Sequence, residues 1–240
     1  MSLDDVLSAP QRAVMERVMA EEQQKRSHLV IALSGAHAYG FPSPDSDLDL
    51  KSIHTDPTAR VLGLHSGTPH VDRMEVIEGV EIDYTSNELK PVILGVLQGN
   101  GNYLERILGP LLLYRAPELE ALRPLVERSL SKRLFRHYLG FATSQLKAFQ
   151  AAGGGSAKKL LYVLRTALTG AHALRTGTIV TDLGELIDDH GLPEARALIA
   201  AKRAGEKSLL SPELASRWTS EVTRVFTALE LAHLRSPLPA

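Results

Sequence analysis

The sequence predicts an α+β fold in its first half, built from strands and helices, followed by an all-α second half. Two observations lead to this prediction. Up to about residue 115, short apolar runs typical of strands occur among helical patterns. From Pro117 onward, helical periodicity dominates and little strand signal remains. We therefore place one domain at residues 1–115 and a helical domain at residues 116–240, since the chain length suits one medium domain or two small ones.

Each element of the first half has its own local signal. Apolar residues at helical spacing indicate a first helix, which Pro10 divides or begins, and short apolar or alternating runs indicate strands. Glu78-Gly79 is typical of a hairpin turn. Thr85, followed three residues later by Glu88, is typical of a capping box at a helix start. The predicted elements are a helix over Leu3–Gln24, strands over His28–Leu33 and Leu48–His54, two strand-like runs within Val71–Thr85, and a helix that begins after Thr85 and ends near Gly99.

The second half is predicted to consist of consecutive helices. Ser211 is the expected N-cap of the last one, with Pro212 at its first helical position. The three glycines at 153–155 indicate a flexible connection. The predicted helices cover residues 117–128, 132–151, 157–175, 182–190, 193–203 and 212–234.

Composition limits the classes of function. A formal net charge of -1 gives no global basic field that would indicate nucleic-acid binding, although a local basic patch would be sufficient. The sequence has no cysteine, which excludes disulfides and thiolate metal sites and is compatible with a reducing cytosol. No stretch approaches the roughly 20 apolar residues of a membrane helix, and the N-terminus does not resemble a secretory signal. We expect a cytoplasmic protein without a membrane partner.

The segment from Gly35 to Asp49 carries the strongest chemical signal. A glycine turn follows a predicted buried strand, and Asp47 and Asp49 then enter the next strand. Because residues i and i+2 of a strand point to the same side, the two carboxylates share one small volume and repel each other unless a cation lies between them. Carboxylate oxygens suit Mg²⁺ and Mn²⁺, and backbone N–H groups at Gly35-Ala36 can face phosphate oxygens. A metal beside such a turn indicates phosphoryl or nucleotidyl transfer.

A third carboxylate would complete a two-metal site. Asp83 and Glu81 share one face of a later predicted strand. Asp83 is preferred because it lies nearer the predicted end of the strand, where sites tend to open. Its expected roles are to bind the catalytic metal and to take a proton from the attacking hydroxyl.

Two other interpretations fit parts of this pattern. An isolated Asp-x-Asp pair is usually a solvated turn. A calcium loop would use Asp45, Asp47, Asp49 and Asp56, which fall at positions 1, 3, 5 and 12 of the EF-hand spacing. However, the sixth position of that loop requires glycine and is Leu50 here. A P-loop is excluded because its glycine-lysine motif does not occur.

Three polar residues near the Asp pair are candidate nucleotide contacts. His37 and Tyr39 flank the glycine turn and would contact nucleotide or acceptor, or else pack beneath the loop. Lys51 shares the predicted strand face of Asp49. It would neutralise phosphate charge or balance the two aspartates.

The second half offers basic candidates. Lys158, Tyr162 and Arg165 fall on one face at the start of a predicted helix, where an N-terminus and cations both attract anions. We expect Lys158 and Arg165 to contact triphosphate or RNA phosphates, with an ordinary solvated basic face as the alternative. A second basic cluster lies at Arg133, Arg136 and His137.

The segment Gly35-Ala-His-Ala-Tyr-Gly40, followed by Ser46-Asp-Leu-Asp-Leu-Lys51, resembles the signature of the DNA polymerase β-like nucleotidyltransferase superfamily, which is Gly-Ser, a short spacer and Asp-x-Asp. Together with the segments 88–100 and 102–105, it resembles a bacterial branch that includes the polymerase β-like group associated with RNA repair. The resemblance covers roughly the first 110 residues. Ala36 stands where the family has serine, which removes a phosphate donor worth about 1 kcal/mol.

The resemblance implies a nucleotidyltransferase fold, with a small mixed sheet and helices packed on it. It implies two Mg²⁺ ions bound by Asp47, Asp49 and Asp83, and a triphosphate lined by Gly35 and Ala36. The implied reaction transfers a nucleoside monophosphate from a nucleoside triphosphate to an acceptor hydroxyl and releases pyrophosphate. An RNA end is one expected acceptor. The alternatives are a protein-modifying or antitoxin-like adenylyltransferase and an inactive nucleotide-binding module. The base, the acceptor and the oligomeric state stay open, and the helical half is expected to form the other wall of the cleft.

Overall fold

The computed structural model describes residues 6–63, 69–205 and 208–240. Within these ranges a five-stranded mixed sheet has the order β3-β4-β2-β1-β5. β2 and β4 run parallel, whereas the other neighbouring strands are antiparallel. The strands are β1 (Ser27–Leu33), β2 (Leu48–Thr55), β3 (His70–Ile77), β4 (Val80–Glu88) and β5 (Leu112–Arg115).

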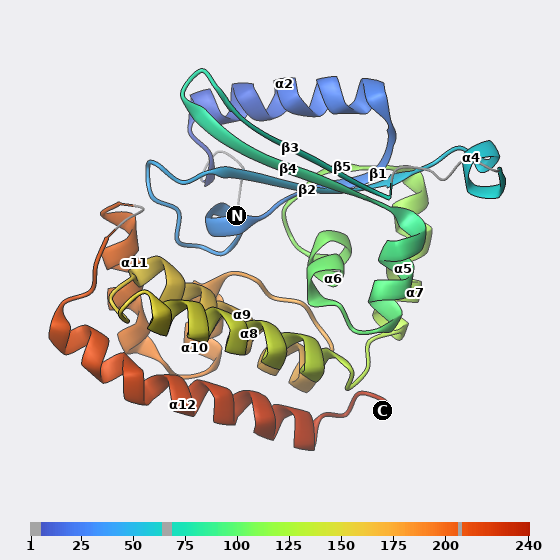
Figure 1. The fold of residues 1–240 in the computed structure, drawn as a ribbon. Helices are drawn as coiled ribbons and strands as arrows, with labels where there is room; N and C mark the ends of the chain where they lie inside the picture. The colour runs from blue at the N-terminus through green and yellow to red at the C-terminus, as the bar shows by residue number, and fades with distance from the viewer. Residues whose placement is uncertain (1–5, 64–68, 206–207) are drawn as a thin grey trace.

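The sheet lies between a single helix and the helical half of the chain (Figure 1). Helix α2 (Ala9–Lys25) covers one face, where Val14 and Val18 pack in one apolar cluster with Leu48 and Leu50 of β2. The opposite face of β2 carries Asp49 and Lys51, since neighbouring residues of a strand alternate between faces. The polar face of this strand is therefore turned toward the helical half.

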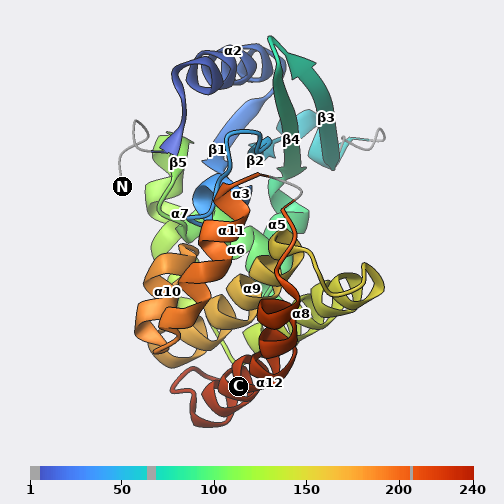
Figure 2. The ribbon, with the colours of Figure 1, turned by 90° about the vertical axis from the view of Figure 1, so that its left-hand side faces the viewer.

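Most helices follow the sheet in sequence and lie on its second face. Figure 2 shows α9 (Ala157–Thr176) in the interior of the helical half. Most residues of α9 are buried, because four helices pack around it: α8 (Leu134–Ala151), α10 (Leu183–Asp189), α11 (Arg196–Arg203) and α12 (Pro212–Arg235). The structure also describes α3 (Gly35–Ala38), α4 (Thr58–Leu62), α5 (Leu89–Leu97), α6 (Gly101–Leu108) and α7 (Pro117–Arg128), with a 3₁₀ turn at Pro193–Ala195.

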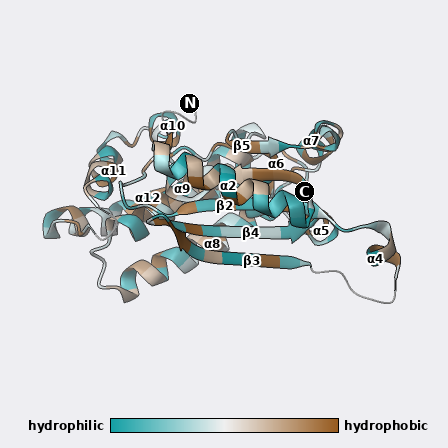
Figure 3. Cartoon of the chain, turned by 90° about the horizontal axis from the view of Figure 1, so that it is seen from above, coloured by the Kyte–Doolittle hydropathy of each residue, from teal (hydrophilic) through white to brown (hydrophobic). Residues whose placement is uncertain are grey.

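Seen from above, β3 forms one edge of the sheet, and α4 lies beyond the end of the strands (Figure 3). Among the described helices, none combines the length and apolar character that crossing a membrane requires.

The structure confirms the α+β fold class with a helical second half, and it confirms most predicted elements. Ser8 caps α2 with Pro10 in its first turn, although residues 3–5 of the predicted helix lie outside the described ranges. The hairpin turn has positive φ at both central residues, 52° at Glu78 and 81° at Gly79, as a type I′ turn requires. Ser211 caps α12 as predicted.

The predicted capping box at Thr85 and Glu88 is wrong. β4 continues to Glu88, and Glu88 itself caps α5 by accepting a hydrogen bond from Lys90 N. The Thr85 hydroxyl instead donates to Asp72 Oδ1 at 3.1 Å. The strand continues because it pairs with β2 as far as His54. Asp83 consequently lies in the middle of β4 and not near its end, while α6 and β5 were not predicted at all.

The domain boundary at residue 116 stays a prediction. One continuous cluster of buried apolar side chains contains Val30 and Ile53 of the sheet together with Leu164 and Leu168 of α9. The two predicted parts therefore share an apolar core in this structure.

Candidate functional site

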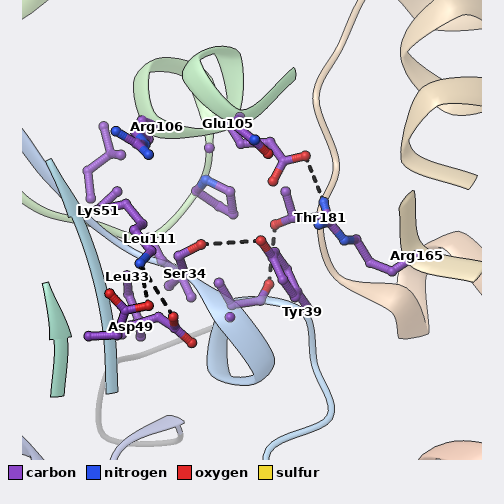
Figure 4. Close-up of a pocket in the computed structure, with 18 of the residues that line it drawn as sticks. Leu33, Ser34, Tyr39, Asp49, Lys51, Glu105, Arg106, Leu111, Arg165 and Thr181 are labelled. Carbon is purple, nitrogen blue, oxygen red and sulfur yellow. Dashed lines mark hydrogen bonds and ion pairs between the residues drawn. The ribbon is translucent and has the colours of Figure 1, made fainter. Parts of the chain in front are cut away.

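A cavity of about 230 Å³ lies between the sheet and the helical half (Figure 4). Residues of β1, α3, β2, β4, α6, α8 and α9 line it, so the chain reaches it from both predicted parts. The predicted site residues in this lining are Gly35, Tyr39, Asp49, Lys51, Asp83 and Arg165.

The register of the parallel strands brings the two cavity-lining aspartates together. Asp49 of β2 pairs directly with Asp83 of β4, so both carboxylates lie on the same face of the sheet. The ammonium group of Lys51 lies between them, 2.8 Å from Asp83 Oδ2 and 3.7 Å from Asp49 Oδ1. Figure 4 shows both contacts. A positive charge is thus already present between the two carboxylates.

Asp49 has an environment that disfavours its charged form. Burial raises the pKa of Asp49 to about 6, against the opposing effect of Lys51. The nearby charges of Asp83 and Asp47 raise this pKa further, while Lys158 lowers it. A cation placed beside Asp49 would relieve this repulsion.

Gly35 is the residue that makes room beside Asp49. Its φ of 62° lies in the left-handed region, which favours glycine. A Cβ atom at this position would overlap the Asp49 carboxylate. The backbone of Ser34 holds the Gly35 turn next to β2, because Ser34 N donates to Asp49 O at 2.9 Å. The following turn, α3, presents first-turn N–H groups without intrahelical acceptors.

Four other predicted residues lie outside the cavity lining. Ala36 is buried in the apolar core. His37 is also buried, with its Nε2 3.2 Å from Gln11 Nε2. Asp47 immediately precedes β2 and Lys158 begins α9, and each is close enough to shift the pKa of Asp49.

Arg165 forms a buried wall of the cavity. Its side chain is 1% exposed, so the predicted alternative of a solvated basic face is wrong for this residue. Arg165 Nη1 donates to Glu105 Oε1 at 2.7 Å, and its guanidinium carbon lies 3.8 Å from the ring centroid of Tyr39. The Tyr39 hydroxyl is 3.2 Å from Ser34 Oγ. Arg165 thus links α6, α9 and the glycine turn.

Sequence reasoning did not identify Arg106 or Glu105 as cavity residues, and it favoured a Ser34 hydroxyl that points elsewhere. Arg106 donates to Ser52 O at 3.3 Å and to Asn87 Oδ1, and burial lowers its pKa. Among the described residues, no carboxylate lies within ion-pair distance of Arg106. All three residues line the cavity. The resemblance of residues 102–105 to the bacterial branch was a signal for Glu105, and it did not reach Arg106.

The donor chemistry of the cavity fits a divalent cation. Asp49 and Asp83 supply adjacent carboxylates, burial together with the charges of Asp83 and Asp47 raises the pKa of Asp49, and Gly35 leaves space. Over the described ranges, however, no three acidic or histidine side chains gather closely enough to bind a metal. The calcium-loop alternative is excluded, because residues 48–55 form a strand that separates Asp49 from Asp56.

The chain is similar to one protein family and to several known proteins. A family model described as "RNA repair pathway DNA polymerase beta family" matches residues 10–238. The chain is 28% identical over 156 residues to uncharacterized protein MJ0002 of Methanocaldococcus jannaschii, covering 64% of this chain and 63% of that protein, which is less than two thirds of its length. It is 27% identical over 203 residues to uncharacterized protein YcgL of Bacillus subtilis, covering 81% of this chain and 77% of that protein.

Among solved structures, a nucleotidyltransferase-like protein from Exiguobacterium sibiricum is similar with a TM-score of 0.38 and 11% identity. The similarity covers 94% of this chain and 75% of that one. A likeness of this size does not bear on function.

Proposed function

This chain belongs to the RNA repair pathway DNA polymerase beta family, and from that premise we propose that it transfers a nucleoside monophosphate from a nucleoside triphosphate to an acceptor hydroxyl. Family membership supports nucleotidyl transfer as the general activity. The description of the family suggests an RNA end as the acceptor. The helical half, proposed as a second domain, would form the wall of the cleft that faces the sheet.

One observation carries the proposal: two carboxylates lie side by side next to a glycine turn. The register of β2 and β4 sets Asp49 beside Asp83, and Gly35 leaves room next to Asp49. Hard oxygen donors therefore lie close to backbone N–H groups within one cavity. A metal-bound triphosphate needs both kinds of group.

Asp47, Asp49 and Asp83 are the proposed ligands of Mg²⁺ or Mn²⁺. The metal would supply positive charge at the phosphate oxygens. Asp49 and Asp83 face the cavity, whereas Asp47 would have to turn toward it from the residue before β2.

The remaining cavity residues can bind and orient the substrate. Lys51 and Arg106 provide positive charge for the phosphates, and the N–H of Gly35 donates to a phosphate oxygen. The N–H of Ala36 is proposed as a second donor from the same turn, although the Ala36 side chain is buried outside the cavity lining. Ser34 lines the cavity and supplies a hydroxyl next to the position where the family has serine. His37, which is buried, would support the turn and not contact the nucleotide.

The proposed reaction exchanges one phosphorus–oxygen bond for another. The acceptor hydroxyl oxygen attacks the α-phosphorus, and a new oxygen–phosphorus bond forms. The bond between the α-phosphorus and the oxygen bridging to the β-phosphate breaks, and that oxygen leaves with its electron pair as part of pyrophosphate. The hydroxyl proton passes to the Asp83 carboxylate.

Transfer of label from α-³²P-labelled nucleoside triphosphates tests this proposal. The protein is incubated with Mg²⁺ or Mn²⁺, each triphosphate in turn, and mixed RNA, protein or small acceptors. We expect label on one acceptor class, and a loss of at least about 100-fold in rate for Asp49→Asn and Asp83→Asn, since each removes a metal ligand.

Glu81→Gln is the matched control, because Glu81 is an exposed carboxylate on the same strand. Its rate should stay within about 2-fold of the wild type, since surface substitutions of this kind are usually small in effect. Absence of label on every acceptor, with both aspartate variants still binding metal and triphosphate normally, would contradict the proposal.

A further inference from the structure

The basic residues of this protein are unevenly distributed. The whole chain has a formal net charge of -1. Between Glu127 and Asp182, however, it has nine lysines and arginines and neither aspartate nor glutamate. Arg165 is neutralised by Glu105, and Arg175 by Asp189. Arg136 and Lys147 lie on α8 and Arg133 immediately precedes it, so these three place positive charge along this helix.

One face of α8 is exposed and basic. Arg133, Arg136, Gly140, Ser144 and Lys147 are all exposed, at spacings of three and four residues that place them on the same side of the helix. In the part of the chain that the structure describes, none of the three cations has a carboxylate within ion-pair distance. In Figure 2, this helix runs along the side of the helical half that lies below β3 and β4.

Two open hollows follow this face. One, of about 850 Å³, lies at the start of α8, where Arg133, Arg136 and the rings of Phe135 and His233 line it. These two rings are stacked with centroids 4.1 Å apart and an interplanar angle of 10°. The second, of about 510 Å³, continues along α8 from Arg136 to Lys147. Phe135 and Arg136 line both hollows, so the two form one continuous surface.

Small residues keep the second hollow open. Gly140 lies in its lining, and a Cβ atom added there would meet no other atom within 4 Å. Thr143 and Ser144 are its neighbours on the same face and offer hydroxyl groups. Cations at both ends with hydroxyls between them suit a chain of phosphate groups.

The first hollow lies close to the cavity between the sheet and the helical half. His137 lines the hollow, and its ring centroid lies 6.0 Å from that of Phe141, which lines the cavity. Asn100 lines the hollow and Asn102 lines the cavity. Residues of the two sites are therefore neighbours at the start of α6 and at this pair of rings.

We propose that the α8 face, defined by Arg133, Arg136, Gly140, Ser144 and Lys147 with the stacked rings of Phe135 and His233, binds a single-stranded polynucleotide. The three cations, which have no carboxylate partner among the described residues, would bind its phosphates, and Arg133 would give up its hydrogen bond to Leu97 O to do so. The stacked rings would accept an unpaired base, and single-strand binding uses this combination of cations and rings. Binding of the polynucleotide does not depend on the proposed function. We further propose that the bound polynucleotide presents its terminal hydroxyl to the cavity beside Asp49 and Asp83, and this step rests on the proposed function.

Fluorescence anisotropy with a labelled 12-nucleotide single-stranded RNA of mixed sequence tests the binding. The variant carries Arg133→Gln, Arg136→Gln and Lys147→Gln. The matched control carries Arg17→Gln, Arg60→Gln and Arg224→Gln, three exposed arginines on α2, α4 and α12. We expect the α8 variant to weaken Kd at least about 10-fold and to reduce the salt slope by about 2, because each lost phosphate contact of a single strand contributes about 0.7. The control should stay within about 2-fold, and unfolding temperatures should show that both variants fold.

An unchanged Kd and salt slope in the α8 variant, or an equal loss in the control, would overturn the inference. So would a 12-base-pair RNA duplex that competes as well as the single strand, or binding to phosphatidylserine vesicles that depends on α8 while RNA does not bind. A single-stranded DNA of the same sequence separates recognition of the backbone from recognition of the ribose. If the wild type transfers label but RNA does not bind through α8, the inference about α8 is contradicted and the proposed function is not. If RNA binds through α8 but no label is transferred, the proposed function is contradicted and the inference about α8 is not.

Discussion

Asp49 shows how a single residue is held in a costly environment. Its carboxylate is mostly buried beside Asp83, and it lies so close to Gly35 that a Cβ atom there would overlap it. Lys51 offsets part of the repulsion. Burial, with the charges of Asp83 and Asp47 in addition, raises the pKa of Asp49 to about 6 from its ordinary value of 3.8. Such strained carboxylates are typical of functional sites.

The raised pKa of Asp49 predicts that the free energy of unfolding of the metal-free protein depends on pH. Between about pH 4 and pH 6 the folded state binds more protons than the unfolded state, so the free energy of unfolding falls as pH rises through this window. A shift of about 2 pH units corresponds to about 3 kcal/mol as an upper bound. Asp49→Asn should therefore match the wild type near pH 4 and be more stable by roughly 2–3 kcal/mol at pH 7.

Urea unfolding in EDTA at pH values from 4 to 7.5 measures this difference. Glu81→Gln serves as the control for loss of an exposed carboxylate on the neighbouring strand. A difference between Asp49→Asn and wild type that does not change with pH would show that Asp49 is not held in this environment.

At the residue scale, the sequence predicted spacing but not long-range register. The Asp-x-Asp pattern and the shared face of Lys51 and Asp49 follow from local alternation, and the structure confirms that face. The direct pairing of Asp49 with Asp83 depends on two strands far apart in sequence, which no local pattern specifies. Ala36 was expected to line the triphosphate, whereas its side chain is buried in the apolar core. The sequence did not separate the two positions, because a small residue after a glycine is compatible with both.

At the element scale, one ion pair joins the helices that enclose the cavity. Arg165 of α9 and Glu105 of α6 are both mostly buried and lie 2.7 Å apart. Burial lowers the pKa of Arg165, but Glu105 and the surrounding tyrosines raise it above its ordinary value. Removal of either partner leaves the other charge buried without a counter-charge.

Arg165→Met should consequently lower the free energy of unfolding by about 3–5 kcal/mol. The double variant Arg165→Met/Glu105→Leu should recover much of this loss, because apolar residues often replace a buried pair without net cost. Arg175→Met is the matched control on the same helix, since its partner Asp189 is exposed to solvent. Its effect should stay below about 1 kcal/mol.

Urea unfolding of the four proteins of the double-mutant cycle, together with Arg175→Met, provides the comparison. Equal effects of Arg165→Met and Arg175→Met, or a cycle without coupling between Arg165 and Glu105, would mean that this pair does not hold α6 against α9.

Elements were predictable where they are long and locally periodic. The helices over α8, α9 and α12 are of this kind, and their predicted bounds agree with the structure to within two residues. Short elements were missed, as α6 with 8 residues and β5 with 4 residues show. The capping signal at Thr85 failed because pairing with β2 extends β4 beyond it, and strand pairing overrides a local cap.

At the scale of the whole molecule, the site lies where two layers meet. Alternation along β2 sends Leu48 and Leu50 toward α2, and Asp49 and Lys51 toward the helical half. The helical half then closes the cavity with side chains from α6, α8 and α9 (Figures 1 and 4). A substrate bound there would contact both predicted parts of the chain at once.

The central claim is that Asp49 and Asp83 bind a metal beside a triphosphate that rests on the Gly35 turn. A crystal structure with Mg²⁺ and a non-hydrolysable nucleoside triphosphate tests it most directly. We expect a metal about 2.0–2.1 Å from oxygens of Asp49 and Asp83, with Lys51 moved from Asp83 to a phosphate and the triphosphate against the turn. A triphosphate bound elsewhere, with Lys51 still between the two carboxylates and no metal beside them, would contradict the claim.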